Sequence, residues 1–432
     1  MFDPRGSRAL VAKSTLPPAT RATPEIALIG NFLPRLCGIA TFTTHLHEAL
    51  RSLPDRPAVD VYAMVDPGRT YDFPAAVTMP IDQEDRGSYR RAAWRIQASG
   101  ARLVWVQHEY GIFGGPAGEY LFDLLDAVPQ PVVATLHTVL EAPNDDQRRV
   151  LDKLAARASL LIVMAERART LLQRVYRVPA SKIAVIEHGV PDRGYVSPSA
   201  ARQCFGAEDR KTIMTFGLLS PDKGIENMIR AMPAILARCP EAIYRIVGAT
   251  HPHLVAHEGE RHRENLQALA RELGVDTHLR WENRFLDEDQ LLDRLATADV
   301  YVTPYRNPQQ ITSGTLSYAA ALGKPIVSTP YIHATELLAD ARGVLVDFDD
   351  PRALGDAVGG LLTDDATRER LAARAFAHGR ALTWRRMAER ARARFAAIAL
   401  APATQKTPLR TLPMAIHGRA GTNQSGRARA FS

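Results

Sequence analysis

At 432 residues the chain is too long for one ordinary hydrophobic core, and its 46% hydrophobic and 23% charged residues are typical of soluble globular proteins. No apolar run approaches the roughly 20 residues of a membrane span, and no secretory segment follows Met1. Three widely spaced cysteines, Cys37, Cys204 and Cys239, fit neither a disulfide framework nor a zinc site, so we expect a cytoplasmic protein of two domains.

The net charge of +7 is concentrated at the two ends of the chain. Residues 1–24 carry +3 and residues 401–432 carry +5, which leaves −1 for residues 25–400. Both ends are rich in Pro, Ala, Thr and Gly, so we predict disordered basic tails, with weak contact to an anionic membrane surface as one role for them. The body lacks a basic stripe with interleaved aromatic residues, so we do not expect it to bind nucleic acid.

Short apolar runs alternate with amphipathic stretches along the body. Strand-like runs form a first series at 26–30, 59–65, 103–108, 132–137, 160–164 and 182–189, and a second at 212–217, 242–248, 279–284, 300–305, 325–330 and 343–348. Helical periodicity lies between most of them, as at 225–239, and again near 384–400. Continuous Val, Ile and Leu runs that alternate with helices predict an α/β protein with two doubly wound, Rossmann-like parallel sheets.

A segment with Pro, Gly and Ser at 190–210 separates the two series. It predicts an N-terminal domain at 25–195 and a C-terminal domain at 196–382, with a helix at 383–400 that crosses back to the first domain. In such folds, ligands bind at the carboxyl ends of the strands, so we expect the site in a central cleft between the domains.

Two loops of the first domain have the composition of ligand-binding loops. In the loop 30–42 (GNFLPRLCGIATF), Gly38 and the flanking Arg35 allow a ligand to approach the backbone, although the dinucleotide fingerprint G-x-G-x-x-G is absent. The loop 107–115 (QHEYGIFGG) gathers His108, Glu109 and Tyr110 at one strand end, which predicts a substrate contact. His137 also ends a strand, and it is a structural residue unless a site lies beside it.

Two segments of the second domain predict an anion site. Lys223 lies at a helix start, where the helix dipole disfavours a cation unless an anionic ligand such as a phosphate is shared; a solvated loop lysine is the alternative. In PQQITSGTLSYAAALGKP (308–325), Thr312 or Ser313 can cap a helix whose first amides, at Gly314 and Thr315, then point outward. Two helix starts and one lysine predict a cradle for a diphosphate.

Residues 25–400 resemble, in order and spacing, the retaining GT-B glycosyltransferases of family 4. The resemblance rests on IEHGVPD (186–192), FGLLSPDKG (216–224), YAAALGKPIVSTP (318–330) and LTWRRMAERARARF (382–395). It implies a nucleotide-sugar donor in the C-terminal domain, an acceptor in the N-terminal domain, and retention at the anomeric carbon without a metal. It also implies that Gly38 lies in the glycine loop of the N-terminal domain, that His137 is the active-site histidine, and that Lys223 contacts the donor phosphate.

Three positions depart from the family pattern. Leu218 replaces the arginine that usually follows the loop glycine Gly217, and Gln310 and Tyr318 replace the two glutamates of the E-x7-E motif. These polar replacements predict an altered site in which Gln310 contacts the donor sugar and Tyr318 grips the ribose loosely. His251 and His253 indicate a metal site only with a third ligand that the sequence does not place, so no metal is predicted.

We therefore expect a hexosyltransferase that moves a sugar from a UDP- or GDP-sugar to a saccharide or related acceptor, with no tightly bound cofactor. The predicted residues are catalytic His137 and Lys223; donor-binding Gly38, Gly217, Lys223, Gln310, Ser313, Gly314, Thr315 and Tyr318; and substrate-binding Arg35, His108, Glu109 and Tyr110. The alternatives are a glycoside phosphorylase on the same fold, which uses inorganic phosphate, and a non-catalytic carbohydrate-binding protein.

Overall fold

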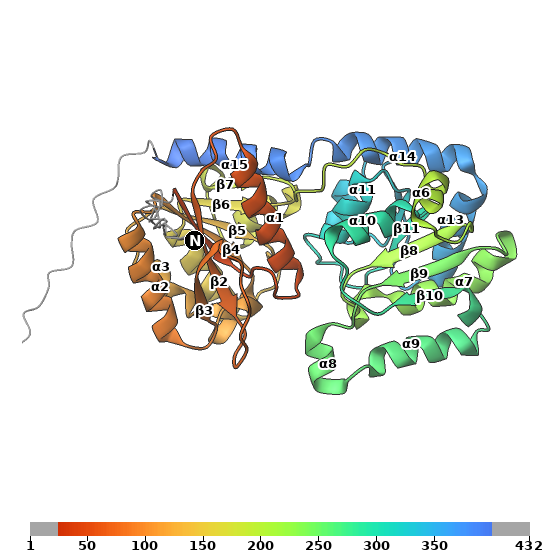
Figure 1. Ribbon diagram of the computed structural model, residues 1–432, viewed down its shortest axis with the longest axis horizontal. Helices are drawn as coiled ribbons and strands as arrows, with labels where there is room; N and C mark the ends of the chain where they lie inside the picture. The colour runs from red at the N-terminus through yellow and green to blue at the C-terminus, as the bar shows by residue number, and fades with distance from the viewer. Residues whose placement is uncertain (1–24, 400–432) are drawn as a thin grey trace, which may run out of the picture.

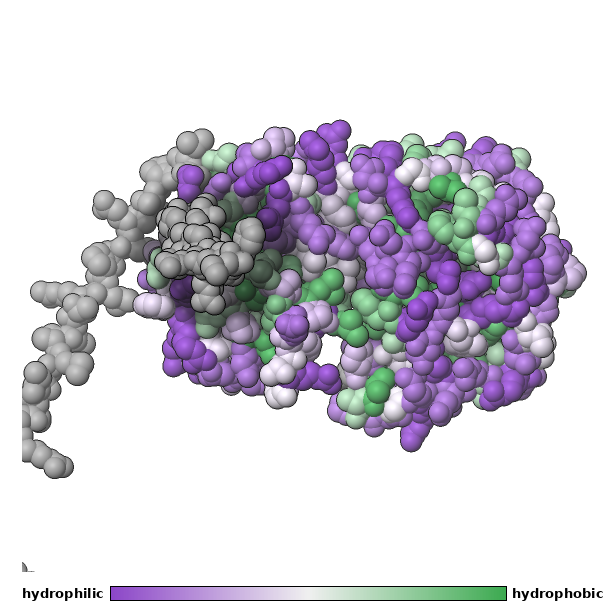
Figure 2. All heavy atoms as spheres, viewed as in Figure 1, coloured by the Kyte–Doolittle hydropathy of each residue, from purple (hydrophilic) through white to green (hydrophobic). Residues whose placement is uncertain are grey.

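The computed structural model describes residues 25–399, which form two lobes (Figure 1). The predicted tails at 1–24 and 401–432 lie outside the described residues. A space-filling view shows a small gap between the two lobes in the lower half of the view (Figure 2).

The first lobe is built on a parallel sheet of seven strands in the order β3-β2-β1-β4-β5-β6-β7. Its strands are β1 (Ile26–Gly30), β2 (Val59–Val65), β3 (Val77–Asp82), β4 (Leu103–His108), β5 (Val132–Leu136), β6 (Leu160–Val163) and β7 (Ile183–Val185). Its helices are α1 (Gly38–Ser52), α2 (Arg86–Ser99), α3 (Leu121–Leu125), α4 (Asp145–Arg157) and α5 (Glu166–Val175). The strand order reverses between β1 and β4, which is where doubly wound sheets open a crevice for ligands.

The second lobe is built on a parallel sheet of six strands in the order β10-β9-β8-β11-β12-β13. Its strands are β8 (Thr212–Phe216), β9 (Ile243–Val247), β10 (Leu279–Glu282), β11 (Val300–Thr303), β12 (Ile326–Ser328) and β13 (Val344–Leu345). Its helices are α6 (Pro198–Phe205), α7 (Ile225–Arg238), α8 (Pro252–Glu258), α9 (Arg261–Glu272), α10 (Glu288–Ala296), α11 (Gly314–Ala321), α12 (Ile332–Leu337), α13 (Pro351–Thr363) and α14 (Asp365–Gly379). The order reverses here between β8 and β11.

The predicted fold class is confirmed, and each predicted strand is present in whole or in part. One strand, β3, was not predicted. It lies at the edge of its sheet, it is mostly half-exposed and it contains Pro80, so it lacks the continuous apolar run of the inner strands.

The chain crosses between the lobes twice, and the two crossings are paired. Val190 N–H donates to Leu382 O at 3.0 Å, and Trp384 N–H donates to Val190 O at 3.0 Å. A methyl group at Gly189 would lie only 2.0 Å from the Trp384 ring, so the indole packs where only glycine fits. The last helix, α15 (Trp384–Ala399), then lies along the first lobe and packs against α1 (Figure 1).

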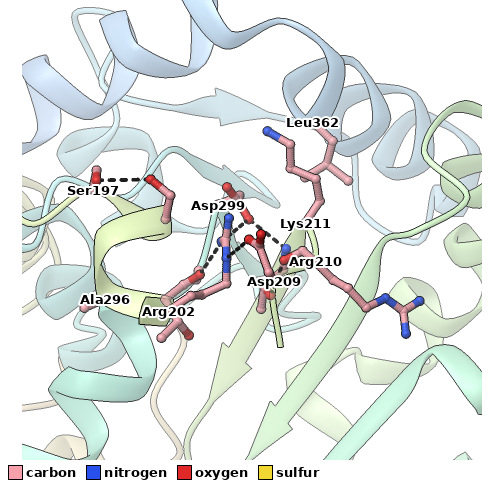
Figure 3. A network of polar contacts seen from close by, with 12 residues as sticks. Ser197, Arg202, Asp209, Arg210, Lys211, Ala296, Asp299 and Leu362 are labelled. Carbon is pink, nitrogen blue, oxygen red and sulfur yellow. Dashed lines mark hydrogen bonds and ion pairs between the residues drawn. The ribbon is translucent and has the colours of Figure 1, made fainter. Parts of the chain in front are cut away.

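A buried ion pair anchors α6 to the second sheet (Figure 3). Arg202 Nη1 donates to Asp299 Oδ2 at 2.8 Å and to Thr297 O at 3.1 Å, and the same carboxylate oxygen accepts the Thr212 N–H at 2.8 Å. Both charged side chains are buried, so loss of either partner leaves the other charge uncompensated, which costs about 3–5 kcal/mol.

Candidate active site

Lys223 ends a 3-10 turn, η4 (Pro221–Lys223), between β8 and α7. Its ammonium lies 4.0 Å from the centre of the Tyr305 ring, and no carboxylate within residues 25–399 pairs with it. The next residue, Gly224, has φ +61°, and a methyl group there would meet Pro304 O at 1.9 Å. The loop after β8 and the loop after β11 are therefore in direct backbone contact at Gly224.

The start of α11 lies beside this lysine. Ser313 is the N-cap residue, and its hydroxyl accepts the Leu316 N–H at 3.3 Å. Thr315 Oγ1 is 2.8 Å from Tyr305 Oη and 3.1 Å from Ser313 Oγ, so polar contacts run from Lys223 through Tyr305 to the helix start. The first N–H groups of a helix have no partner within it, and they bind anions well.

Gly217 and His333 complete the surroundings of this helix start. Gly217 has φ +128°, and a methyl group there would lie 3.4 Å from Thr315 Cγ2, so β8 and α11 approach closely. His333 Nδ1 accepts the Ser313 N–H at 2.9 Å, which requires a hydrogen-free Nδ1. Burial lowers the pKa of His333 to about 3 and therefore favours this neutral form. The structure thus brings Gly217, Lys223, Ser313, Gly314 and Thr315 together.

Two histidines of the first lobe pack on Phe42, and one of them, His188, also contacts the start of α11. His188 Nε2 is 3.0 Å from the position that a Gly314 methyl group would take, and its ring lies 5.1 Å from that of Phe42. The His137 ring lies 4.7 Å from Phe42, and its Nε2 is 3.2 Å from Gln107 Oε1. The sequence prediction missed His188, although it lies in the motif IEHGVPD that supported the family resemblance.

Both imidazoles are neutral at neutral pH. Burial, together with the neighbouring His188 and His108 rings, lowers the pKa of His137 to about 3, and burial lowers the pKa of His188 to about 4. These side chains can therefore orient a substrate by hydrogen bonds, and they add no charge to the site.

Gln310 and Tyr318 are both engaged within the protein. Gln310 Nε2 donates to Thr312 O at 2.6 Å, so this amide turns back on its own loop. Tyr318 Oη lies 3.0 Å from His45 Nδ1, in the first lobe, and 3.2 Å from Glu288 Oε1. Tyr318 is 6% exposed. Its hydroxyl therefore links the lobes, and a ribose contact for Tyr318 stays a proposal.

Gly38 and Arg35 lie at the carboxyl edge of the first sheet. Gly38 is the first residue of α1, and a methyl group there would meet no atom within 4 Å, so the space beside it is open. Arg35 donates to Asn31 Oδ1 and to Asp66 Oδ1, each at 2.6 Å. The guanidinium is therefore held between the loops that follow β1 and β2.

Of the three other predicted substrate residues, His108 and Tyr110 are buried and Glu109 is half-buried. Successive residues of a strand point to opposite faces, so Gln107 reaches His137 whereas His108 turns into the core against Phe113. His108 is 0% exposed and neither of its nitrogens has a hydrogen-bond partner. Glu109 accepts Thr138 Oγ1–H at 2.5 Å, and burial raises its pKa. Tyr110 is also buried, so Glu109 and the main chain of this loop are the parts that stay candidates for substrate contact.

Within residues 25–399, no three His, Cys, Asp or Glu side chains are arranged to hold a metal ion. The segment with His251 and His253 forms the start of α8. No helix in the same range is long and apolar enough to cross a bilayer.

The fold is of the GT-B type found in glycosyltransferases that use nucleotide-sugar donors. Residues 38–193 match the family model described as Glycosyltransferase Family 4, and residues 200–378 match that described as Glycosyl transferases group 1. The chain belongs to this family of retaining glycosyltransferases. The predicted family resemblance is thereby confirmed.

Two curated relatives carry related names. The D-inositol 3-phosphate glycosyltransferase of Corynebacterium diphtheriae is 29% identical over 66% of this chain and 69% of its own length. The GDP-mannose-dependent alpha-(1-6)-phosphatidylinositol monomannoside mannosyltransferase of Mycolicibacterium smegmatis is 32% identical over 42% of this chain and 48% of its own length.

Solved structures share the fold at lower identity. The sucrose-phosphate synthase of Thermosynechococcus elongatus has a TM-score of 0.69 at 18% identity, over 86% of this chain and 98% of the other. HepE of Anabaena, in complex with UDP, has a TM-score of 0.67 at 18% identity, over 86% and 100%.

Proposed function

We propose that this chain transfers a hexosyl group, with retention, from a UDP- or GDP-sugar to a hydroxyl of a saccharide or related acceptor in the cytoplasm. One observation carries the proposal: Gly217 and Lys223, in the loop after β8, converge with the start of α11, after β11, around a cation with no partner carboxylate within the described residues. A nucleoside diphosphate supplies the negative charge that this arrangement lacks.

The relatives and the fold support a donor of this class. The mycobacterial relative is named for GDP-mannose, and HepE was solved with UDP. The three cysteines of this chain are free thiols, which suits a reducing compartment such as the cytoplasm.

The proposed reaction exchanges one bond at the anomeric carbon for another. The bond from that carbon to the diphosphate oxygen breaks, the acceptor oxygen bonds on the same face, and the acceptor proton passes to the departing diphosphate. Lys223 and the outward amides of Gly314 and Thr315 stabilise the charge that develops on the leaving group. His137, with a pKa of about 3, is too weak a base to take that proton, so we assign it the orientation of the sugar.

Ligand binding and one substitution test this proposal. A ligand at 100 times its dissociation constant adds about 2.7 kcal/mol to the free energy of unfolding, so UDP or GDP should raise the melting temperature whereas inorganic phosphate alone should not. Lys223→Ala should lower kcat/KM about 100-fold, the scale of one positioned electrostatic contact.

Lys153→Ala is the matched control, because Lys153 pairs with Asp126 on the surface of the first lobe. It should leave kcat/KM unchanged. Full activity of Lys223→Ala would remove the basis for the diphosphate site.

A glycoside phosphorylase is the second candidate. It is favoured because neither of the two positions where the family pattern has glutamates carries a carboxylate here. The Tyr318 hydroxyl instead contacts His45, and the Gln310 amide donates to its own loop. A phosphorylase would cleave a disaccharide only with added phosphate and would not be stabilised by any nucleotide.

A further inference from the structure

We propose that the acceptor of this enzyme is a neutral saccharide or polyol rather than a phosphorylated one, and that it binds at a polar cluster of Asn31, Arg35, Asp66 and Tyr71 at the carboxyl ends of β1 and β2. The inference rests on the proposed transferase function and specifies its acceptor.

The cluster is a connected set of hydrogen-bond donors and acceptors. Arg35 donates to Asn31 and Asp66 at 2.6 Å each, and Tyr71 Oη–H donates to Asp66 Oδ2 at 2.5 Å. Arg35 is 13% exposed and Asp66 31% in their side chains, so the pair is held at the rim of the lobe. Its geometry matches that of a bidentate partner for vicinal hydroxyls, which donate to a carboxylate and accept from a guanidinium.

An aromatic pair adjoins the cluster. The Tyr71 and Phe73 rings lie 5.5 Å apart at 48°, and both residues are only partly buried. Sites that orient a small uncharged ligand usually combine aromatic surface with a small number of polar groups. A pyranose ring has an apolar face and equatorial hydroxyls, so it can use both parts of this surface.

The charge of this edge disfavours a phosphate. Asp66 already neutralises the Arg35 guanidinium at 2.6 Å. A phosphate at this cluster would therefore lie beside the Asp66 carboxylate, or would have to break the Arg35–Asp66 pair to reach the guanidinium.

The position of the cluster suits an acceptor. It lies beside the point between β1 and β4 at which the strand order reverses. The following helix, α1, starts at Gly38 in open space and carries Phe42, which packs on His137 and His188 next to the donor helix α11. An acceptor at the cluster thus lies on the path from the rim of the first lobe to the reacting carbon.

Matched acceptor pairs test the inference with the full chain. Initial rates would be measured with the nucleotide sugar that stabilises the protein, using myo-inositol against D-myo-inositol 3-phosphate, glucose against glucose 6-phosphate, and mannose against mannose 6-phosphate. We expect the neutral member of any pair that is used to have at least tenfold higher kcat/KM. A higher value for a phosphorylated member would overturn the inference.

Saturation-transfer NMR with the same compounds covers the case in which no pair turns over. Contact with a neutral member is then the expected result, whereas contact with phosphorylated members only, or with none, overturns the inference. Failure of every nucleotide to bind in the thermal-shift panel would instead refute the proposed function, so the two failures are distinguishable.

Asp66→Asn gives the sharpest test, because it removes the neutralising charge while it keeps the shape of the side chain. We expect it to raise the ratio of kcat/KM for the phosphorylated over the neutral member at least tenfold. Asp55→Asn is the matched control, since Asp55 pairs with Arg392 away from this edge and should leave the ratio unchanged. Tyr71→Phe, which removes only one hydroxyl, should raise KM for the neutral acceptor two- to tenfold without changing nucleotide binding. An unchanged ratio in Asp66→Asn together with an unchanged KM in Tyr71→Phe would overturn the assignment.

Discussion

Lys324, in the second lobe, illustrates how burial alters the pKa of one side chain. It is 1% exposed, and its ammonium donates to Ala296 O at 2.6 Å and to Ala298 O at 3.3 Å, at the end of α10. Burial lowers the pKa of this amine to about 7, against the partly opposing effect of the nearby Asp299 carboxylate. The unfolded chain, with an ordinary lysine pKa of about 10.4, therefore binds more protons than the folded one between these values.

This difference predicts a pH dependence of stability. Because the unfolded state binds the extra proton, the contribution of Lys324 to the free energy of unfolding is least favourable below pH 7 and rises as the pH increases from about 7 to 10. Lys324→Met should therefore flatten the stability profile over that range. Urea unfolding at a series of pH values measures it, with the exposed Lys153→Met as control; an unaltered slope in Lys324→Met would contradict the prediction.

At the scale of the elements, the features that the sequence predicted correctly are those that depend on residues close together in the chain. Inner strands such as β2 and β4 are unbroken apolar runs because both faces of the sheet are covered, so their limits were predicted to the residue. The cap of α11 and the lysine before α7 follow from residue type and spacing in the same way. Contacts between segments far apart in the chain were not predictable: Arg35 with Asp66, His188 with Gly314, and Tyr318 with His45.

The start of α5 is the clearest example of a distant contact. Its N-cap residue, Ala165, has no side-chain acceptor. The missing acceptor comes from Glu336 in α12 of the other lobe, whose two carboxylate oxygens accept the Glu166 N–H at 2.8 Å and the Arg167 N–H at 2.7 Å. A carboxylate at a helix start also interacts favourably with the helix dipole.

Glu336→Ala should therefore lower the free energy of unfolding by about 1 kcal/mol, the usual effect of losing an N-cap. Glu336→Gln keeps one good acceptor, so it should lose less than Glu336→Ala. Glu389→Ala is the control, because Glu389 pairs with Arg385 and Arg386 on the surface of α15 and its loss should change stability by less than about 0.5 kcal/mol. Equal effects of Glu336→Ala and Glu389→Ala in urea unfolding would show that the cap between the lobes is not formed in solution.

At the scale of the whole molecule, the segment that carries the donor helix also holds the lobes together. Ile311 packs into the core of the first lobe, and Tyr318 contacts both His45 and Glu288. Glu336 caps α5 a little further along. The part of the second lobe that we propose binds the diphosphate is therefore the part that contacts the first lobe, so we expect donor binding and the arrangement of the lobes to be coupled.

A double-mutant cycle measures this contact. Tyr318→Phe and His45→Ala each remove one partner of the same hydrogen bond, so their effects on the free energy of unfolding should show a coupling of about 0.5–1.5 kcal/mol. Tyr244→Phe, whose hydroxyl bonds to Thr215 within the second lobe, should show no coupling with His45→Ala. Additive effects for the Tyr318 and His45 pair would mean that the lobes do not meet there in solution.

The paired crossings at Val190 and Thr383 restrict which way the lobes can travel. Two segments of the chain that are joined side by side by hydrogen bonds bend easily across their common plane, whereas twisting them would strain the bonds between Val190 and its partners Leu382 and Trp384. The Trp384 ring packs directly against the backbone of Gly189, so we expect the bend to be centred there. We therefore expect the lobes to open and close by a hinge motion about these paired segments. Each closure would then return α11 to the same position against the first lobe.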